Sequence, residues 1–572
     1  MRIESRPVPV HLPELGDLPP LLQRLYAARG VASIAELDRS LKSLLPFDLF
    51  KGMPEAVAVL RCALERQQPI LIVGDFDCDG ATASSVAVLA LRALGAGHVN
   101  YLVPNRFEYG YGLTPEIVEV ALARKPEVLV TVDNGISSIE GVAAAKAAGL
   151  SVVVTDHHLP AEQLPAADAI VNPSQPGCDF PSKAVAGVGV IFYVMLALRA
   201  ELRESGWFNA TRPEPNLAEL LDLVALGTVA DVVPLDANNR ILVHQGLARI
   251  RSGRCRPGIR ALLEVAGRPA QQLVSTDLGF IVGPRLNAAG RLDDMSMGIE
   301  CLITDNEDLA RDIARELDGL NKDRKAIERD MQQQALASLE AVSVTEQELP
   351  FGLCLFDPGW HQGVIGILAS RLKDRYHRPV IAFADAGDGM LKGSARSVAG
   401  LHIRDALDAV AAANPGLISK FGGHAMAAGL SLPEALFEQF RIAFDAEVRR
   451  QLVADDLTGR VLSDGELCAE EFTLPLAAQL REAGPWGQHF PEPGFHGEFQ
   501  IIQQRLVGER HLKMVVQLPG CTNLLDAIAF NIDPAIWPNP AIQRVVLAYT
   551  LDINEFRGQQ NLQLLVKHVQ PA

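Results

Sequence analysis

The clearest pattern along the chain is an alternation of short apolar runs with amphipathic stretches, which begins at residue 70. The apolar runs are rich in β-branched residues and lie at 70–73, 98–103, 128–132 and 151–155. The amphipathic stretches between them are followed by glycine, proline or a short polar break and lie at 82–94, 114–124 and 138–148. Strands and helices that alternate at this spacing predict a doubly wound α/β domain with a parallel sheet. We expect this first domain to span residues 51–300.

Other segments of the chain carry different patterns. Residues 1–50 are rich in proline and leucine, and they predict an irregular lead-in with short helices. Apolar residues recur at helical spacing within the charged segment 303–342, which predicts a helix that bridges two domains. An α/β pattern returns over residues 350–450. About five short alternating runs in residues 455–572 predict a small antiparallel barrel.

Acidic residues and histidines stand where the strands of the first domain are predicted to end. They are Asp75, Asp77 and Asp79 after the first run, Asp133 after the third, Asp156, His157 and His158 after the fourth, and Asp231 after a long apolar helical run. Ligands of open parallel sheets bind outside the carboxyl ends of the strands. Carboxylates this close raise one another's pKa unless a cation compensates their charge. One such aspartate would fit a helix N-cap, but the four segments together predict a two-metal site for phosphoryl chemistry.

Length, charge and cysteine content narrow the class of protein. A chain of 572 residues is too long for one core and predicts two to four domains. The net charge of −17 argues against a globally basic nucleic-acid binder, although it leaves room for a local basic groove. The 8 cysteines lie far apart without a Cys-x-x-Cys pair, which excludes a typical zinc site or disulfide scaffold. With no signal peptide and no apolar run as long as a bilayer span, we expect a cytoplasmic protein with reduced thiols.

Motifs in both halves of the chain resemble those of the DHH phosphoesterase superfamily. In the first half the sequences GDFDCDG, VTVDNGIS, TDHHLP and LGTVADVVPL occur in the order and spacing of the superfamily's four motifs. In the second half PGWHQGVIGILASRL (358–372), GSARS (393–397) and FGGHAMAAG (421–429) resemble the DHH-associated domain. NRFEYGYG (105–112) and GPRLNAAGR (283–291) resemble segments of the RecJ family of single-strand-specific 5′→3′ DNA exonucleases. The resemblance covers nearly the whole chain, and no acidic motif position departs from the pattern.

The resemblance implies a fold, an activity and partners. The expected fold joins a parallel-sheet DHH domain, a bridging helix, a second α/β DHH-associated domain and a C-terminal OB-fold barrel for single strands. The implied activity is removal of mononucleotides from the 5′ end of single-stranded DNA during DNA repair and recombination. Two divalent cations per site, Mn²⁺ or Mg²⁺, would activate water, and the imidazole ligand favours manganese. A monomer is expected, with a single-strand-binding protein and a RecQ-type helicase as partners.

Three groups of site residues are carried over from the resemblance. The expected metal ligands are Asp75, Asp77, Asp79, Asp133, His157 and Asp231. The expected catalytic group is His158, Asp156 and His424, of which the two histidines would donate to the scissile phosphate. The expected contacts to the 5′ phosphate and the DNA are Arg106, Arg285, Arg291, Ser394 and Arg396, with the residues from 393 to 397 and from 422 to 424 in glycine-rich loops.

Some residues and functions have two readings from sequence alone. Phe530, Tyr549, Phe556 and Arg557 could stack on bases or fill the core of the barrel. Other, smaller members of the superfamily hydrolyse cyclic dinucleotides, short oligoribonucleotides or polyphosphate, and some relatives are non-catalytic scaffolds in replication complexes. The long C-terminal barrel argues against a small soluble substrate. The complete set of acidic residues argues against a scaffold that has lost its metals.

Overall fold

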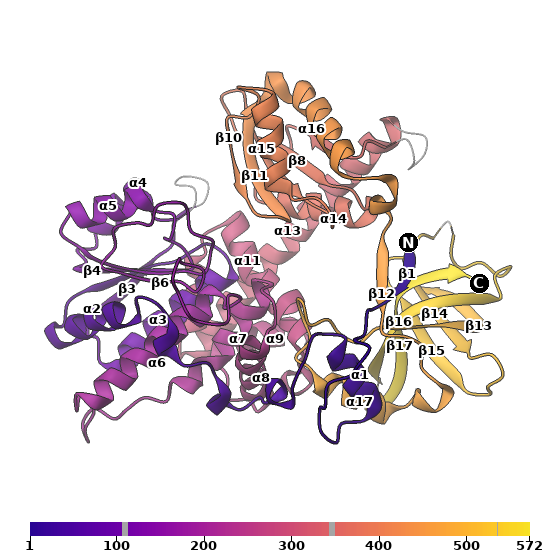
Figure 1. The fold of residues 1–572 in the computed structure, drawn as a ribbon, viewed down its shortest axis with the longest axis horizontal. Helices are drawn as coiled ribbons and strands as arrows, with labels where there is room; N and C mark the ends of the chain where they lie inside the picture. Colours follow the sequence, from indigo (N-terminus) through magenta and orange to yellow (C-terminus); the bar gives the residue numbers. More distant parts are fainter. Residues whose placement is uncertain (106–111, 343–348, 509, 535, 557) are drawn as a thin grey trace. The chain divides into compact units, whose positions relative to one another are not determined.

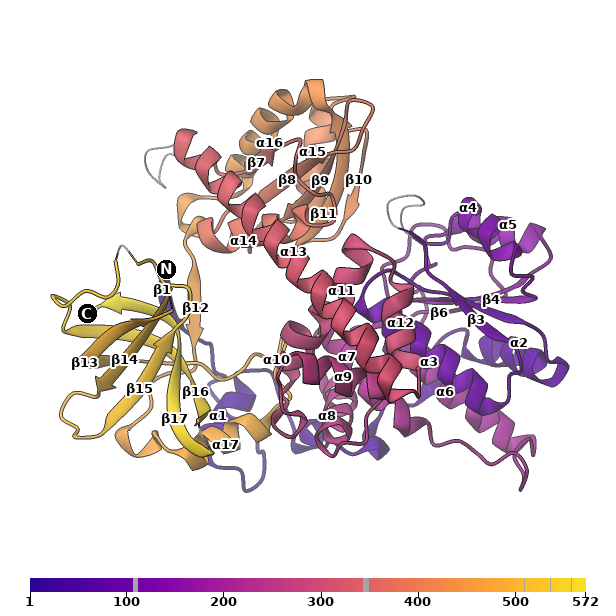
Figure 2. The ribbon, with the colours of Figure 1, turned by 180° about the vertical axis from the view of Figure 1, so that it is seen from behind.

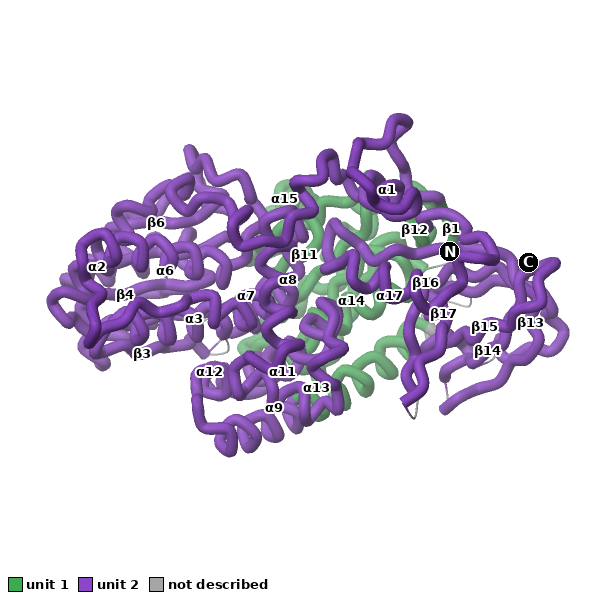
Figure 3. Tube along the Cα trace, turned by 90° about the horizontal axis from the view of Figure 1, so that it is seen from below, with its two compact units in different colours: residues 1–4, 321–462 green, residues 5–320, 463–572 purple. Residues whose placement is uncertain are grey.

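The computed structural model describes residues 1–105, 112–342, 349–508, 510–534, 536–556 and 558–572. These residues form two compact units, distinguished by colour in Figure 3. The larger unit contains residues 5–320 and 463–572, and the smaller unit contains residues 1–4 and 321–462. The chain passes from the larger to the smaller unit within one long helix, α13 (Glu307–Val342). No helix among the described residues is both long and apolar enough to cross a bilayer.

A parallel sheet of five strands forms the first half of the larger unit (Figure 1). Its strand order is β3-β2-β4-β5-β6, with β2 (Ile70–Val73), β3 (Val99–Leu102), β4 (Val128–Val132), β5 (Ser151–Thr155) and β6 (Ala169–Val171). The chain adds strands on both sides of β2, so the carboxyl ends of β2 and β4 lie at a topological switch point. The predicted parallel sheet is confirmed; β6 was missed because three residues are too short to give a pattern.

Helices cover both faces of this sheet, because successive residues of each buried strand point to opposite sides. Ile70 and Ile72 contribute to a core with helices α2, α3 and α6, whereas Leu71 and Val73 contribute to a second core with α4 and α5. The bounds are α2 (Met53–Arg66), α3 (Cys78–Leu94), α4 (Pro115–Leu122), α5 (Ile139–Ala147) and α6 (Gly187–Glu204). The domain is therefore doubly wound, as predicted.

A helical layer follows the sheet within the larger unit. It contains α7 (Leu221–Ala230), α8 (Ala237–Arg251), α9 (Pro257–Val265), α10 (Ser275–Asp277), the π-helix η6 (Leu278–Val282), α11 (Gly283–Leu292) and α12 (Ser296–Ile303). Helix α7 is buried from Leu221 to Thr228, in keeping with its uniformly apolar sequence, and it ends at Asp231. The N-terminal lead-in contains β1 (Arg2–Ser5), α1 (Pro20–Ala27) and the 3₁₀ helices η1 (Ile34–Leu37), η2 (Leu41–Ser43) and η3 (Phe47–Leu49). Three further 3₁₀ turns in the larger unit are η4 (Leu217–Leu220), η5 (Ala270–Gln272) and η10 (Ala469–Glu471).

The smaller unit is built on a mixed five-stranded sheet. Its order is β10-β11-β9-β8-β7, with β7 (Leu353–Phe356), β8 (Val380–Asp385), β9 (Met390–Arg396), β10 (Lys420–Gly423) and β11 (Ala427–Pro433). Only the β7–β8 pair is parallel among these described strands. Its remaining elements are α14 (Ile365–Tyr376), α15 (Ile403–Ala413), η8 (Glu434–Leu436), α16 (Phe437–Gln451) and η9 (Ala454–Leu457).

The glycine-rich segments of the smaller unit are strands rather than the loops expected from the sequence. Residues 393–396 belong to β9, and residues 421–423 belong to β10. Gly393 fits within a strand because Phe383 packs over it: a Cβ there would lie 2.5 Å from Cε1 of Phe383. Glycine composition misled the prediction because it signals close packing as often as a turn.

The C-terminal part of the larger unit is a closed five-stranded barrel, seen from behind in Figure 2. Its strands are β13 (Phe495–Val507), β14 (His511–Gln517), β15 (Leu524–Ala529), β16 (Arg544–Phe556) and β17 (Gln559–Pro571). All pairs are antiparallel except β15–β17, which closes the barrel with a parallel pair. Tyr549 is 1% exposed and lies in the core, whereas Phe530 is 52% exposed. Arg557 and the side chain of Phe556 lie outside the described part of the structure.

The segment that precedes the barrel packs against the N-terminal lead-in, and from Ser463 onwards it belongs to the larger unit. It contains β12 (Arg460–Ser463) and α17 (Leu474–Ala483). The rings of Tyr26 and Trp486 are stacked with their centroids 6.1 Å apart. Arg29 and Asp464 form an ion pair of 2.8 Å in which both side chains are almost fully buried. Residues 5–50 of the lead-in are therefore an integral part of the larger unit, whereas residues 1–4 belong to the smaller unit.

Candidate active site

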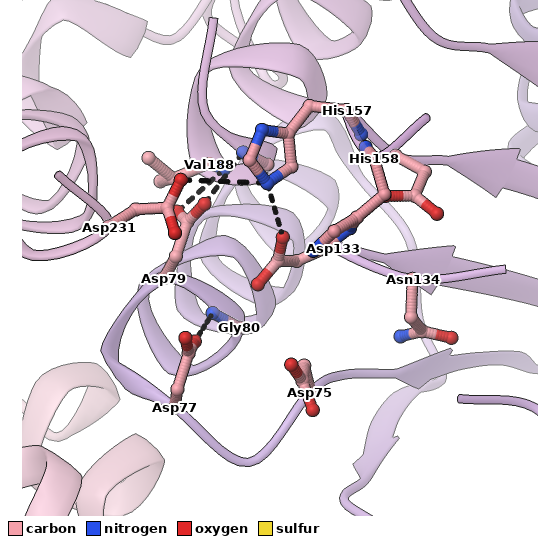
Figure 4. Close-up of polar contacts among 12 residues, drawn as sticks. Asp75, Asp77, Asp79, Gly80, Asp133, Asn134, His157, His158, Val188 and Asp231 are labelled. Atoms are coloured by element: carbon pink, nitrogen blue, oxygen red, sulfur yellow. Dashed lines mark hydrogen bonds and ion pairs between the residues drawn. The ribbon is translucent and has the colours of Figure 1, made fainter. Parts of the chain in front are cut away.

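The ends of β2, β4 and β5 and the end of α7 bring acidic residues and histidines together (Figure 4). We call the following six residues the acid cluster: Asp75, Asp77, Asp79, Asp133, His157 and Asp231. Three sets of donors have ligand atoms within 4.8 Å of one another: Asp75, Asp77 and Asp133; Asp79, His157 and Asp231; and Asp133, His157 and His158. Asp133 and His157 each occur in two sets, so the sets form one continuous site. All six expected metal ligands are among these residues.

The first acidic loop is held by hydrogen bonds at both ends of the motif. Asp77 caps α3 and accepts the backbone N–H of Gly80 at 2.9 Å. Asp79 is fully buried and accepts the N–H groups of Gly187 (2.7 Å) and Val188 (2.9 Å). These two donors belong to the first turn of α6, where the helix dipole favours an anion. Asp79 is therefore fixed by a helix that begins more than a hundred residues later.

Glycines make room for the buried carboxylates. A Cβ at Gly187 would lie 2.6 Å from Oδ1 of Asp133, and a Cβ at Gly227 would lie 2.8 Å from Oδ1 of Asp79. Asp133 itself adopts φ 61°, a left-handed conformation that aspartate tolerates better than most residues. Helices α6 and α7 thus each present a glycine where a carboxylate lies.

The histidines that follow β5 have different surroundings. His157 places Nε2 3.1 Å from Oδ1 of Asp133 and 3.6 Å from Oδ2 of Asp231. His158 places Nδ1 2.7 Å from Oδ1 of Asp156. Asp156 also accepts the backbone N–H groups of His157, His158 and Ile136. The carboxylate of Asp156 therefore holds the histidine loop, and His157 bridges two carboxylates of the acid cluster.

Burial and mutual repulsion make the acid cluster hard to ionise without a cation. Burial, together with the charge of Asp77, raises the pKa of Asp79 to about 7. Burial and the neighbouring carboxylates raise the pKa values of Asp133 and Asp231 well above their usual range. Carboxyl groups that converge at such a cost fit the donor set of a hard divalent cation, which would compensate their charge. The residues present therefore fit a metal centre.

Asp156 and His158 titrate as an ion pair. Burial opposes the charged form of His158, but the hydrogen bond and charge of Asp156, with smaller effects of Asp75 and Asp77, raise the pKa of His158 to about 9. Burial likewise opposes the charged form of Asp156, and its hydrogen bond to His158 lowers the pKa of that carboxyl below its usual value. The hydrogen bond and the charge of Asp156 therefore favour the protonated form of His158.

Ser394 and Arg396 lie in β9 of the smaller unit and form a separate polar site. Nη1 of Arg396 donates to Oγ of Ser394 at 3.1 Å and to the carbonyl of Ala395 at 2.8 Å. A Cβ at Gly366, in the first turn of α14, would lie 2.9 Å from both Nη2 of Arg396 and Oγ of Ser394. Burial lowers the pKa of the guanidinium, and no carboxylate pairs with it in the described part of the chain. A half-buried cation of this kind is suited to an anionic ligand.

The other expected contacts belong to different elements of the two units. Arg285 in α11 donates to Asp318 from Nε (2.9 Å) and to the carbonyl of Ile281 from Nη1 (2.6 Å). Arg291 is half-buried in the last turn of α11. His424 follows β10, where its backbone N–H donates to the carbonyl of Ala427. Arg106 lies outside the described residues.

Two supporting residues were not found by sequence reasoning. Nδ2 of Asn134 donates to the carbonyls of Val73 and Val132, which ties together the ends of β2 and β4. Oδ1 of Asn287 accepts the N–H of Cys78 at 2.8 Å, which ties α11 to the first acidic loop. Asn134 lies in the motif DNG and Asn287 in the motif GPRLNAAGR, so both could have been proposed as site residues from their place in these motifs.

Family models match three parts of the chain. The model of the DHH family, N-terminal domain, matches residues 69–228, the DHHA1 domain matches residues 345–450, and the RecJ OB domain matches residues 463–568. The single-stranded-DNA-specific exonuclease RecJ of Dickeya dadantii is 61% identical over 98% of this chain and 97% of its own length. That of Escherichia coli K12 is 59% identical over 97% of this chain and 96% of its own length.

Solved structures agree with these matches. The crystal structure of RecJ in complex with Mn²⁺ from Thermus thermophilus has a TM-score of 0.81 at 31% identity and covers 100% of this chain and 79% of that chain. The complex with Mg²⁺ from the same organism has a TM-score of 0.75 at 29% identity, covering 100% of this chain and 78% of that chain.

Proposed function

This chain belongs to the RecJ family, and we propose that it is a single-stranded-DNA-specific exonuclease whose cleavage takes place at the acid cluster. The observation that carries the proposal is the convergence of five carboxylates and an imidazole at the switch point of a parallel sheet. The match over nearly the full length of the relatives supports the same activity and the same three domains.

Mn²⁺ or Mg²⁺ is the proposed cofactor, with two ions per site, in keeping with the cations named for the Thermus thermophilus structures. Asp75, Asp77 and Asp133 would hold one ion, and Asp79, His157 and Asp231 would hold the other. When bound, such cations supply Lewis-acid polarisation of a phosphate and lower the pKa of water. The protein contributes a donor set fixed in advance by the starts of α3 and α6.

His158 is the proposed donor to a phosphate oxygen of the bond that is cut. Its Nδ1 lies 2.7 Å from Oδ1 of Asp156, and this hydrogen bond orients the imidazole. Asp156, predicted as part of the catalytic group, is in this proposal a positioning residue, because its oxygens already accept from His158 and from three backbone N–H groups. His424 remains proposed as a second donor.

Recognition of a terminal 5′ phosphate is assigned to Ser394 and Arg396. A phosphate would supply the anion that the guanidinium lacks among the described residues, and Gly366 lets both side chains pack against the first turn of α14. Such a contact would set the 5′→3′ polarity, because only a chain terminus presents a phosphate monoester. Arg106, Arg285 and Arg291 remain proposed DNA contacts. Arg285 already forms an ion pair with Asp318, so it would have to bind a phosphate in addition to that carboxylate.

The other expectations about the protein's surroundings also remain proposals. The barrel is assigned an additional surface for single strands, in keeping with its match to the RecJ OB domain. All eight cysteines are free thiols, which supports a reducing, cytoplasmic location. A monomeric state, a role in DNA repair and recombination, and the two partners, a single-strand-binding protein and a RecQ-type helicase, rest on the family resemblance alone.

The test compares labelled substrates with the full-length protein in Mn²⁺, Mg²⁺ or EDTA. We expect mononucleotides from 5′-phosphorylated single-stranded DNA with either cation and none in EDTA. Duplex DNA, cyclic dinucleotides and short oligoribonucleotides are run in parallel. Faster turnover of any of these three, or release that begins at the 3′ end, would overturn the proposed substrate or polarity.

A further inference from the structure

Phe280 is an aromatic residue whose side chain is exposed to solvent. It is 81% exposed, while its helical neighbours Leu278 and Val282 are fully buried. Aromatic side chains normally bury most of their surface, and the residue lies at the middle of the π-helix η6. π-helices are rare and occur often at functional sites. Neither the packing of the core nor the proposed metal centre accounts for an aromatic residue at this position.

The π-helix packs on the end of α7, beside residues of the acid cluster. A Cβ at Gly279 would be 3.3 Å from Cγ1 of Val229, and a Cβ at Gly283 would be 3.2 Å from Cβ of Ala230 and 3.9 Å from Sγ of Cys78. Ala230 precedes Asp231, and Cys78 stands between Asp77 and Asp79. The junction of η6 and α11 therefore packs on residues that lie next to Asp77, Asp79 and Asp231, and the exposed Phe280 belongs to the same turn.

A second exposed apolar residue lies next to the same contact. Val232 follows Asp231, is 61% exposed and has φ 64°. Its backbone N–H donates to the carbonyl of Val229, the residue on which Gly279 packs. A left-handed conformation is strained for a β-branched residue, and such strain is found mostly at functional positions. We call Phe280 and Val232 the apolar rim of the acid cluster.

The size and position of the apolar rim indicate its ligand. Two side chains are far too small for a protein interface, but one aromatic ring matches the face of one nucleobase. Bases of a single strand are free to stack on an aromatic residue, and every base offers a π-face, so the contact needs no particular sequence. A base inside a duplex has both faces covered by its neighbours and cannot make this contact.

We propose that Phe280, supported by Val232, stacks on one base of the DNA strand near the bond that is cut. The inference rests on the proposed exonuclease function and adds a substrate-binding residue outside the metal and phosphate sites. It also gives the larger unit a means to favour unpaired DNA. Stacking holds the base in the ground state and the transition state alike, so its loss should raise KM and change kcat little.

The experiment pairs variants of Phe280 with substrates that lack one base. An abasic site is placed in turn at each of the first several positions from the 5′ end of a single-stranded oligonucleotide. Phe280→Ala should raise KM on the intact substrate by between about 5-fold and 150-fold, the range for loss of one stacked base. Phe280→Trp should keep the wild-type KM. Leu309→Ala, which shortens another exposed apolar side chain (44% exposed), is the matched control and should change nothing.

The decisive readout is the coupling between protein and substrate changes. In the wild type, an abasic site at one position should raise KM by the same factor as Phe280→Ala raises it on the intact substrate. In the Phe280→Ala variant, an abasic site at that position should raise KM no further. Additive losses at every position, or an unchanged KM for Phe280→Ala, would overturn the stacking role. A wild-type protein that does not degrade single-stranded DNA would instead overturn the proposed function. If Phe280→Ala were to unfold, Phe280→Leu would replace it, because leucine keeps the apolar contact and lacks the π-face.

Discussion

Asp79 accepts the backbone N–H of Gly187 at 2.7 Å, so the first acidic motif is fixed to the start of a helix 108 residues further along the chain. Gly187 also faces Asp133, where a Cβ would lie 2.6 Å from Oδ1. One glycine at the start of α6 therefore serves two carboxylates: its N–H binds the first, and its missing side chain makes room for the second. This arrangement explains how carboxyl groups with raised pKa values are held together without a cation.

The cation-free protein should lose stability as the pH rises. Asp79 has a folded-state pKa of about 7 against an ordinary value of 3.8. The folded state therefore keeps a proton that the unfolded state releases, and stability falls between about pH 4 and pH 7. The full penalty, roughly 4 kcal/mol from Asp79 alone, is present above that range. Asp79→Asn removes this titration, so in EDTA it should narrow the stability difference between pH 5.5 and pH 8.

Urea unfolding of the wild type and of Asp79→Asn in EDTA measures this effect. Asp526→Asn, which changes an aspartate paired with Lys513 on the barrel, serves as the control. In the wild type, Mn²⁺ should raise the unfolding midpoint more at pH 8 than at pH 5.5, because protons compete with the cation. The same dependence on pH in wild type and Asp79→Asn would refute this account of the carboxyl.

Asp133→Ala should abolish cleavage and leave the protein folded. Asp133 belongs to two of the three donor sets. Its loss removes a ligand of one proposed cation and a neighbour of His157, which is a ligand of the other. We expect activity to fall at least about 10³-fold, in line with the loss of a step that depends on metal. Labelled-oligonucleotide assays in Mn²⁺ give the rate, and the Mn²⁺-induced shift in melting temperature gives cation binding. Activity within a few-fold of wild type would contradict the metal assignment.

Arg396→Ala should impair substrates with a 5′ phosphate far more than substrates with a 5′ hydroxyl. A charge-assisted hydrogen bond is worth roughly 1.5–3 kcal/mol, or about 10- to 150-fold in kcat/KM. Gly366→Ala should give a smaller loss in the same direction, because its Cβ would enter the space beside Arg396 and Ser394. Arg441→Ala is a control, since this arginine pairs with Glu438 in the same unit. Equal losses on both substrates would show that Arg396 does not read the terminus.

Asp156→Asn should make activity fall at a lower pH than in the wild type as the pH is raised. Without the carboxylate, the pKa of His158 should fall from about 9 towards its ordinary value near 6.5. The cationic fraction of His158 would then drop about 30-fold at pH 8 and less than about 2-fold at pH 6. Rates measured at saturating Mn²⁺ across this range should show the alkaline limb moved to lower pH. A loss of the same size at pH 6 and pH 8 would mean that Asp156 supports only the fold of the loop.

The periodic part of the sequence predicted the first domain well. Strands β2, β4 and β5 coincide with the apolar runs, because buried parallel strands must be apolar on both faces. The chemistry at their ends followed from the same logic, since parallel strands bring their carboxyl ends to one edge. The sequence pattern also places Asp231 correctly after an apolar helix, and it joins the acid cluster because α7 ends beside β2 and β5 residues.

Other features depended on contacts that no local pattern encodes. The sequence predicts loops at β9 and β10 because Gly393 and Gly422 have no β propensity, and only packing such as that of Phe383 on Gly393 makes the first of them a strand residue. The positioning role of Asp156 could not be predicted, because the sequence does not show whether an aspartate accepts backbone N–H groups or faces a cation. The exposure of Phe280 was not predicted either, because an apolar residue between buried Leu278 and buried Val282 would ordinarily be assigned to the core.

The larger unit is assembled from two stretches of chain, and this has a consequence during synthesis. A ribosome completes the acid-bearing sheet early, yet the surface around Tyr26 and Arg29 must wait for Trp486 and Asp464. Throughout that interval the nascent protein carries an uncovered apolar patch and a cation without its buried counter-ion. Exposed apolar surface of this kind makes a folding intermediate prone to aggregation. We therefore expect the yield of active protein to depend on how quickly residues 464–486, which precede the barrel, leave the exit tunnel.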